Sequence, residues 1–203
     1  MYSTKPHIVY GFHATNKADG IRILNEKSQF EASRNAYDWL GKGIYFWENG
    51  LKRVWQYADL DSKRPNSRIK EPFVLGVVLE LGNCLDLLDQ KYIDLLAAAH
   101  EYTVASLTEL GRTLPENKRT TSGDFDFKRR ELDCAVINQL HEKLTEEEAT
   151  PFDTVRAAFL EGQELYPGAG FKQNNHIQIA VINRNCIKGI FLPRERENHS
   201  EAW

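Results

Sequence analysis

The sequence predicts one domain of the mixed α+β class, and three observations lead to this prediction. Short runs rich in β-branched and aromatic residues, which suit a pleated sheet, stand at residues 7–14, 40–48, 73–81 and 178–192. Segments with apolar residues at helical spacing separate these runs. A length of 203 residues with 41% hydrophobic and 27% charged residues fits a single globular domain with a sizeable core.

The first elements alternate between strand and helix. Residues 7–14 are predicted to form a strand that delivers His13 to its end, and residues 17–27 follow as a short amphipathic helix. A buried strand comes after the glycine pair Gly41 and Gly43. Glycine has no side chain, so the backbone at this strand can approach a ligand closely.

Further elements are predicted from the same two patterns, the β-rich runs and the apolar residues at helical spacing. A helix is expected at residues 51–60, a polar loop at residues 61–70 and a strand buried on both faces at residues 73–81. Two long segments then carry broad apolar stripes at helical spacing. They cover residues 86–110 and 131–144.

The last third of the chain is predicted to return to the sheet. Residues 150–160 begin with Thr-Pro-Phe-Asp, a helix-start signal, and are predicted to be helical. The domain 1–203 would therefore carry a helical insertion at about residues 86–160. A glycine-rich loop at residues 161–175 leads directly into a final pair of strands at residues 178–192.

Charge gives no overall reason to expect a polyanionic partner. The formal net charge is −3 and the isoelectric point is near 6.1. The densest positive charge lies in residues 112–130, where a turn-rich loop leads into the second long helix. A solvated loop face is the favoured interpretation of this cluster, and a contact with RNA or DNA is the alternative.

Cysteine spacing and hydropathy indicate the cellular compartment in which the protein is expected. Cys84, Cys134 and Cys186 share no Cys-x-x-Cys or Cys/His ligand spacing, so reduced, mostly buried thiols are expected and no metal site is predicted. The first ten residues contain no signal-like apolar stretch, and no segment approaches the ~20 apolar residues that span a membrane. The expected location is cytoplasmic, without a membrane partner.

Three separated motifs form one known pattern. The first strand ends in His13-Ala14-Thr15, the run Gly41-Lys42-Gly43-Ile44-Tyr45-Phe46 follows, and Tyr57 stands on the next helix. The last strand pair has the frame of one that usually begins with a glutamate, and Gln178 holds that position. This pattern resembles the ADP-ribosyltransferases of the diphtheria-toxin and poly(ADP-ribose) polymerase type.

The resemblance implies a fold, a substrate and a site. The fold would be an ADP-ribosyltransferase-like split antiparallel sheet flanked by helices, which holds NAD as a substrate between its two halves, with no metal. The catalytic residues would be His13, Tyr45 and Gln178. Tyr45 and Tyr57 would sandwich the nicotinamide ring. The residues implied in binding NAD are His13, Ala14, Thr15, Gly43, Tyr45 and Tyr57.

Two departures from the pattern limit the chemistry. Residues 51–57 contain no serine or threonine, although many relatives contact the carboxamide with a serine there. A carboxylate about 4 Å from a developing cation contributes about 4 kcal/mol at an effective dielectric near 20, against about 1 kcal/mol for a neutral hydrogen bond. The difference corresponds to roughly two orders of magnitude in rate. Acids that could compensate are Glu161, Glu164, Asp124 and Asp126.

The predicted function is transfer of a single ADP-ribose unit from NAD to a macromolecular acceptor, which is a protein or a nucleic acid. In the family, loss of the glutamate goes with single-unit transfer rather than polymer synthesis. Small standalone domains of this type resemble bacterial or phage-related toxins and phage-defence effectors, so an antitoxin is a possible partner. Two alternatives stay open. One is an inactive module that binds NAD, ADP-ribose or RNA, and the other is an NAD glycohydrolase.

Overall fold

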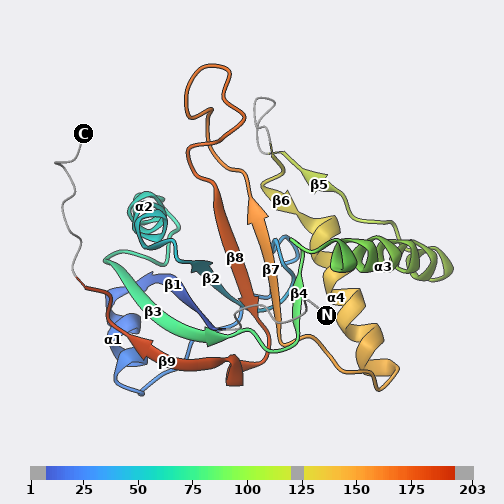
Figure 1. Ribbon diagram of the computed structural model, residues 1–203, viewed down its shortest axis with the longest axis horizontal. Helices are drawn as coiled ribbons and strands as arrows, with labels where there is room; N and C mark the ends of the chain where they lie inside the picture. Colours follow the sequence, from blue (N-terminus) through green and yellow to red (C-terminus); the bar gives the residue numbers. More distant parts are fainter. Residues whose placement is uncertain (1–7, 120–125, 195–203) are drawn as a thin grey trace.

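The computed structural model describes residues 8–119 and 126–194 and has the mixed α+β class that the sequence predicts (Figure 1). Its large sheet has seven strands in the order β4-β7-β8-β2-β1-β3-β9, and β5 and β6 form a separate pair. Within the large sheet, β4 and β7 are parallel and the other neighbours are antiparallel. The elements are β1 (Ile8–Asn16), α1 (Lys17–Leu24), β2 (Ile44–Glu48), α2 (Leu51–Ser62), β3 (Pro72–Glu80), β4 (Cys84–Asp86), α3 (Gln90–Glu109), β5 (Asn117–Lys118), β6 (Arg129–Arg130), α4 (Glu131–Glu146), β7 (Thr154–Phe159), β8 (His176–Val181), η1 (Arg184–Cys186) and β9 (Ile187–Phe191).

The first half of the chain confirms the order of elements read from the sequence. Strands β1, β2 and β3 and helices α1 and α2 lie within a few residues of their expected positions, although His7, expected to begin the first strand, lies outside the described residues. Helix α1 is shorter than expected because Glu26 adopts a left-handed conformation with φ of 59°, which turns the chain out of the helix. In the described part of the chain, no helix is both long and apolar enough to cross a membrane.

The helix predicted at residues 150–160 is wrong, because this segment forms strand β7. Thr154 and Val155 are adjacent in sequence and both fully buried, so both faces of the strand are covered. Strand β7 lies between β4 and β8 and pairs with both. Backbone hydrogen bonds to two neighbours therefore outweigh the local helix-start signal. The predicted insertion thus contains a strand of the large sheet as well as the long helices α3 and α4.

Hydrophobic clusters cover the two faces of the sheet. Phe46 and Leu75 belong to the cluster on one face. On the other face, Trp47 packs with residues of α2, while Val155 packs with residues of α3 and α4. Neighbouring strand residues point to opposite faces, which explains why Phe46 and Trp47 belong to different clusters. Figure 1 shows α2 at one end of the sheet and α3 and α4 at the other, with β2 and β8 between them.

Candidate functional site

The backbone pairing between β1 and β2 ends just before His13. These strands pair only at Gly11 with Glu48 and at Phe12 with Trp47, whereas β1 pairs with β3 along all of its 9 residues. Beyond the last pair, Nδ1 of His13 lies 2.8 Å from the carbonyl oxygen of Tyr45. A carbonyl can only accept, so Nδ1 carries the proton and Nε2 is left as an acceptor in the neutral ring.

His13 is held in an aromatic environment. Its ring centroid lies 5.1 Å from that of Phe30 and 5.6 Å from that of Phe46. Burial lowers the pKa of His13 below its ordinary value, and the hydrogen bond to Tyr45 opposes this only in part. The ring is therefore neutral at neutral pH, and its Nε2 is suited to accept a hydrogen bond from a hydroxyl group.

Tyr45 is anchored to the turn that contains the glycine pair. Its hydroxyl accepts a hydrogen bond from the backbone N–H of Leu40 at 2.8 Å and donates one to the carbonyl oxygen of Gly41 at 2.7 Å. Burial raises the pKa of Tyr45 above its ordinary value, so the phenol keeps its proton. These contacts fix the ring of Tyr45 in one orientation relative to β2.

We expect Gly41→Ala to lower the free energy of unfolding by about 2 kcal/mol, a fall in melting temperature of about 4–8 °C. Gly41 has φ of 74°, and a Cβ there would lie 2.8 Å from Oδ1 of Asn138 and 2.9 Å from Cγ2 of Ile137. Gly111→Ala is the matched control, because Gly111 has φ of 63° with nothing within 4 Å of the added Cβ. Thermal denaturation gives the melting temperatures of both variants and of the wild type. Equal losses would show that backbone strain acts alone and that the turn is not tightly packed.

Gln178 and Tyr45 face the same side of the sheet, and His13 faces the other. On β8, Gln178 pairs with Trp47 and Ala180 pairs with Tyr45, so Gln178, Trp47 and Tyr45 share one face. Phe12 pairs with Trp47, which turns His13 toward the opposite face. The three residues thus lie on three neighbouring strands. A ligand can touch all three only by lying across the point where the β1–β2 pairing ends.

The other residues that the resemblance implies also lie around β1 and β2. Ala14 is buried in the cluster that contains Trp47, and Thr15 is half-buried near the end of β1. Both backbone polar groups of Gly43 bond to the backbone of Ser33, with N–O distances of 2.8 and 3.2 Å. Gly43 therefore offers close approach of its backbone rather than a free N–H. The ring of Tyr57 packs against that of Trp47 at a tilt of 41°, with centroids 5.0 Å apart.

Three residues of this region were missed by the sequence-based prediction. Trp47 is 8% exposed, and its Nε1 is buried without a hydrogen-bond partner among the described residues. His176 lies 3.0 Å from Gln178 through Nε2 of each side chain, and Arg53 of α2 pairs with Glu161. Strict alternation along β2 and β8 would have placed Trp47 and His176 beside Tyr45 and Gln178. No sequence signal points to Arg53.

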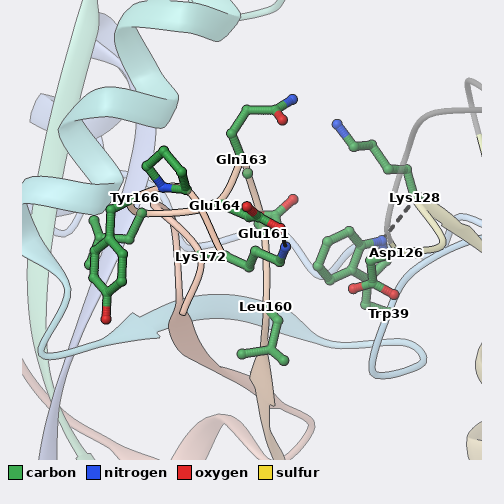
Figure 2. Close-up of a pocket in the computed structure, with 12 residues that line it drawn as sticks. Trp39, Asp126, Lys128, Leu160, Glu161, Gln163, Glu164, Tyr166 and Lys172 are labelled. Carbon is green, nitrogen blue, oxygen red and sulfur yellow. Dashed lines mark hydrogen bonds and ion pairs between the residues drawn. The ribbon is translucent and has the colours of Figure 1, made fainter. Parts of the chain in front are cut away.

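A pocket of about 720 Å³ lies beside this region. Its walls come from the connection between β7 and β8, residues 160–167 with Lys172, and from Trp39, Asp126 and Lys128. Figure 2 shows Glu161 and Lys172 facing Trp39 across the pocket. Glu161 also contacts His176, so the pocket wall reaches the neighbourhood of Gln178.

The four acids considered as substitutes for the missing glutamate have different positions. Glu161 lies near Gln178 by way of His176. Glu164 is 3.9 Å from Nζ of Lys172, and Asp126 pairs with Arg130 on β6. Asp124 lies outside the described residues. Of the three described acids, only Glu161 is linked to Gln178 through one intervening side chain, that of His176, which makes it the acid that the geometry favours.

The basic cluster is largely paired with acids of its own region. Arg129 pairs with Glu131 at 2.5 Å, and Arg130 pairs with Asp126 at 2.7 Å. The guanidinium of Arg130 also lies over the adjacent rings of Trp39 and Phe159, at 4.8 Å from each centroid. These pairings favour the interpretation of a structured loop face over that of a nucleic-acid contact.

The chain was compared with protein-family models, with curated proteins and with solved structures, and none of the three comparisons found a match. Its function is therefore inferred from the residues and their geometry.

Proposed function

We propose that the protein is a mono-ADP-ribosyltransferase that transfers ADP-ribose from NAD to a macromolecular acceptor. The observation that carries this proposal is the end of the β1–β2 pairing at His13, which brings the His13 side chain against the backbone of the Tyr45 motif. His13 contacts the backbone of Tyr45 at this point, and Gln178 lies on the next strand. Small-molecule sites combine apolar and aromatic walls with a few convergent polar groups, and this region offers both.

The aromatic side chains support binding of the nicotinamide end of NAD. Tyr45 is fixed by its two hydrogen bonds, and Tyr57 and Trp47 form a tilted aromatic pair on the face that Tyr45 shares with Trp47. Stacking contributes about 0.5–1.5 kcal/mol beyond the burial of area. When the bond between ribose C1′ and the nicotinamide nitrogen breaks, nicotinamide leaves with the bonding electron pair and positive charge develops on the ribose. A nucleophile of the acceptor then attacks C1′ and loses its proton.

Gln178 would act on the ribose as a neutral group. Its amide oxygen can accept a hydrogen bond from a ribose hydroxyl, but it cannot balance the developing charge as a carboxylate would. A lower rate and the transfer of single units are consistent with this residue. His13, with Nε2 free to accept, would hold the hydroxyl groups of the adenosine ribose.

The acceptor is a protein or a nucleic acid. The pocket between residues 160–167 and Lys128 is connected to Gln178 through Glu161 and His176, and its wall carries both acids and lysines. In the family that the sequence resembles, the loop in this position shapes the acceptor site. That resemblance also extends to cytoplasmic toxins and phage-defence effectors, so we include control by an antitoxin in the proposal.

The test is incubation of the purified chain with NAD labelled in the adenosine part, in the presence of cell extract. We expect release of nicotinamide and label in macromolecules, and treatment with protease or nuclease identifies the acceptor. Tyr45→Ala serves as the inactive control. Free ADP-ribose without a labelled acceptor would identify an NAD glycohydrolase instead.

A second candidate is a module that binds NAD or ADP-ribose without cleaving it. The specific observation in its favour is that the Trp47 ring lies against the Tyr57 ring at a tilt of 41°, so part of the Tyr57 ring surface is already covered. For such a module, bound NAD would quench the fluorescence of Trp47. The NAD would remain intact after long incubation. Nicotinamide release above that of the Tyr45→Ala variant would exclude it.

Gln178→Glu is expected to raise the rate of NAD cleavage about tenfold. A carboxylate stabilises the developing charge better than an amide, but the lone pair of His176 Nε2 lies 3.0 Å away and opposes part of the gain. Nicotinamide release measures the effect. Gln173→Glu is the matched control, because Gln173 lies in the connection before β8 rather than on it. An unchanged rate in Gln178→Glu would mean that another residue occupies the catalytic position.

A further inference from the structure

Gln178 stands at the end of a chain of polar contacts that links β8 to α2. Its Nε2 lies 3.0 Å from Nε2 of His176, and Nδ1 of His176 lies 2.7 Å from the carbonyl oxygen of Asn174. The same Nδ1 lies 3.7 Å from Oε2 of Glu161, which in turn is 2.8 Å from Nη2 of Arg53. Gln178, which takes the place of the missing glutamate, is therefore held by His176, and His176 is in turn held by Asn174 and Glu161.

These contacts determine which nitrogen of His176 carries the proton. Nδ1 faces two oxygen atoms, from Asn174 and Glu161, and oxygen atoms of this kind accept hydrogen bonds. Nδ1 must therefore donate, so Nε2 of the neutral ring has a lone pair. Only the NH₂ end of the Gln178 amide can bond to that lone pair. The amide oxygen of Gln178 is then directed away from His176, and it has no hydrogen-bond partner among the described residues.

The ring of His176 is tightly enclosed. Its side chain is 2% exposed, and its centroid lies 5.7 Å from that of Phe159 and 6.3 Å from that of Trp47. A ring packed between two aromatic side chains cannot turn over without displacing them. The direction of the lone pair on Nε2 is thus fixed by packing as well as by the contacts at Nδ1.

We propose that His176 is a positioning residue that holds the Gln178 amide with its oxygen directed at the substrate. The inference rests on the proposed function and deepens it. A carboxylate has two equivalent acceptor oxygens, whereas an amide has one acceptor end and one donor end. In the wrong orientation, Gln178 would present N–H groups to a developing positive charge. A site that uses glutamine here therefore needs an orienting partner, and His176 provides one.

The same arrangement gives an acidic limit to activity. Protonation of Nε2 removes the lone pair, so the Gln178 amide loses its partner and is free to turn its NH₂ end toward the substrate. Burial lowers the pKa of His176 below its ordinary value, while Glu161 raises it and Arg53 lowers it. Tyr57 also interacts electrostatically with Glu161 and Arg53, and with Asp61 and Arg64 of the same region. Activity should be full at neutral pH and fall as the pH drops through the lowered pKa of His176.

The experiment compares His176→Phe with His141→Phe. Phenylalanine keeps a flat ring between Trp47 and Phe159 but removes both nitrogens. His141 of α4 is the matched control, because it is a half-buried histidine whose pKa is also lowered by burial. We expect His176→Phe to reduce kcat for nicotinamide release about tenfold with KM for NAD within about twofold, as for the loss of one hydrogen bond. His141→Phe should match the wild type.

A double-mutant cycle separates positioning from a general structural effect. In the Gln178→Glu background, His176→Phe should not lower kcat and should raise it, because a carboxylate needs no orientation and the opposing lone pair of Nε2 is removed. The fall in activity at acidic pH that belongs to His176 should also be absent in that background. Equal losses in both backgrounds would overturn the positioning role while leaving the proposed function intact.

A readout without NAD tests the contacts themselves. Nitrogen-15 chemical shifts of the imidazole ring should show protonated Nδ1 and unprotonated Nε2 in His176 at neutral pH. The opposite tautomer would overturn the inference, whether or not the protein cleaves NAD. Failure of the wild type to release nicotinamide, with the expected tautomer present, would instead overturn the proposed function and with it the catalytic meaning of the contact.

Discussion

Tyr45→Ala is expected to reduce nicotinamide release at least about a hundredfold. The substitution removes the ring proposed to stack on nicotinamide, and it also removes both hydrogen bonds to the turn at Leu40 and Gly41. The turn leads directly into β2, which carries the neighbouring site residues. A displacement of about 1 Å at a reacting centre can cost a hundredfold in rate, so the two losses reinforce each other.

Tyr45→Phe separates the ring from the hydroxyl. It keeps the stacking surface but leaves the N–H of Leu40 without its hydroxyl acceptor, so we expect a smaller fall of about tenfold and a loss of about 1–2 kcal/mol in stability. Tyr10→Ala is the control, because the Tyr10 side chain is exposed on β1. Nicotinamide release and thermal denaturation are measured on all three variants. A folded Tyr45→Ala protein with wild-type activity would contradict the site assignment.

Local patterns were sufficient to predict the elements that carry the candidate site. The run that ends at His13 and the run around Tyr45 have strand periodicity within themselves, and the helix after Tyr45 shows its apolar stripe directly. Each of these features depends on residues close together in sequence. The structure accordingly has β1, β2 and α2 close to the positions expected. The roles of His13, Tyr45 and Gln178 in handling NAD remain predictions from the resemblance.

Features that depend on distant partners could not be read from the sequence. Residues 154–159 contain two alanines and follow a helix-start signal, and only their pairing with β4 and β8 makes them a strand. The contact of Arg53 with Glu161 joins residues that are 108 positions apart. Glu161 was one of four acids considered, and nothing local distinguished it from the others. Its position against His176 depends on a long-range ion pair between the β7–β8 connection and Arg53 of α2.

Arg156→Met is expected to lower the free energy of unfolding by about 3–5 kcal/mol, or the melting temperature by about 10 °C. Arg156 of β7 bonds Glu48 of β2 at 2.6 and 3.0 Å and Asp86 of β4 at 3.2 Å. The exposed fractions of these side chains are 16%, 10% and 8%. Removing the guanidinium leaves two largely buried carboxylates without their shared cation, and burying an uncompensated charge is costly.

Two comparisons test this explanation by denaturant and thermal unfolding. Arg64→Met removes an ion pair with Asp61 in which Arg64 is 68% exposed, and it should change stability by no more than about 1 kcal/mol. Adding Glu48→Met to Arg156→Met should recover part of the lost free energy of unfolding, because one of the two unpaired buried charges is replaced by an apolar side chain of similar length. Lowering the pH should also reduce the difference in free energy of unfolding between Arg156→Met and the wild type, because protonation of Glu48 and Asp86 removes the repulsion between their carboxylates. If the double variant were less stable than Arg156→Met, the loss would arise from packing of the arginine stem and not from the stranded carboxylates.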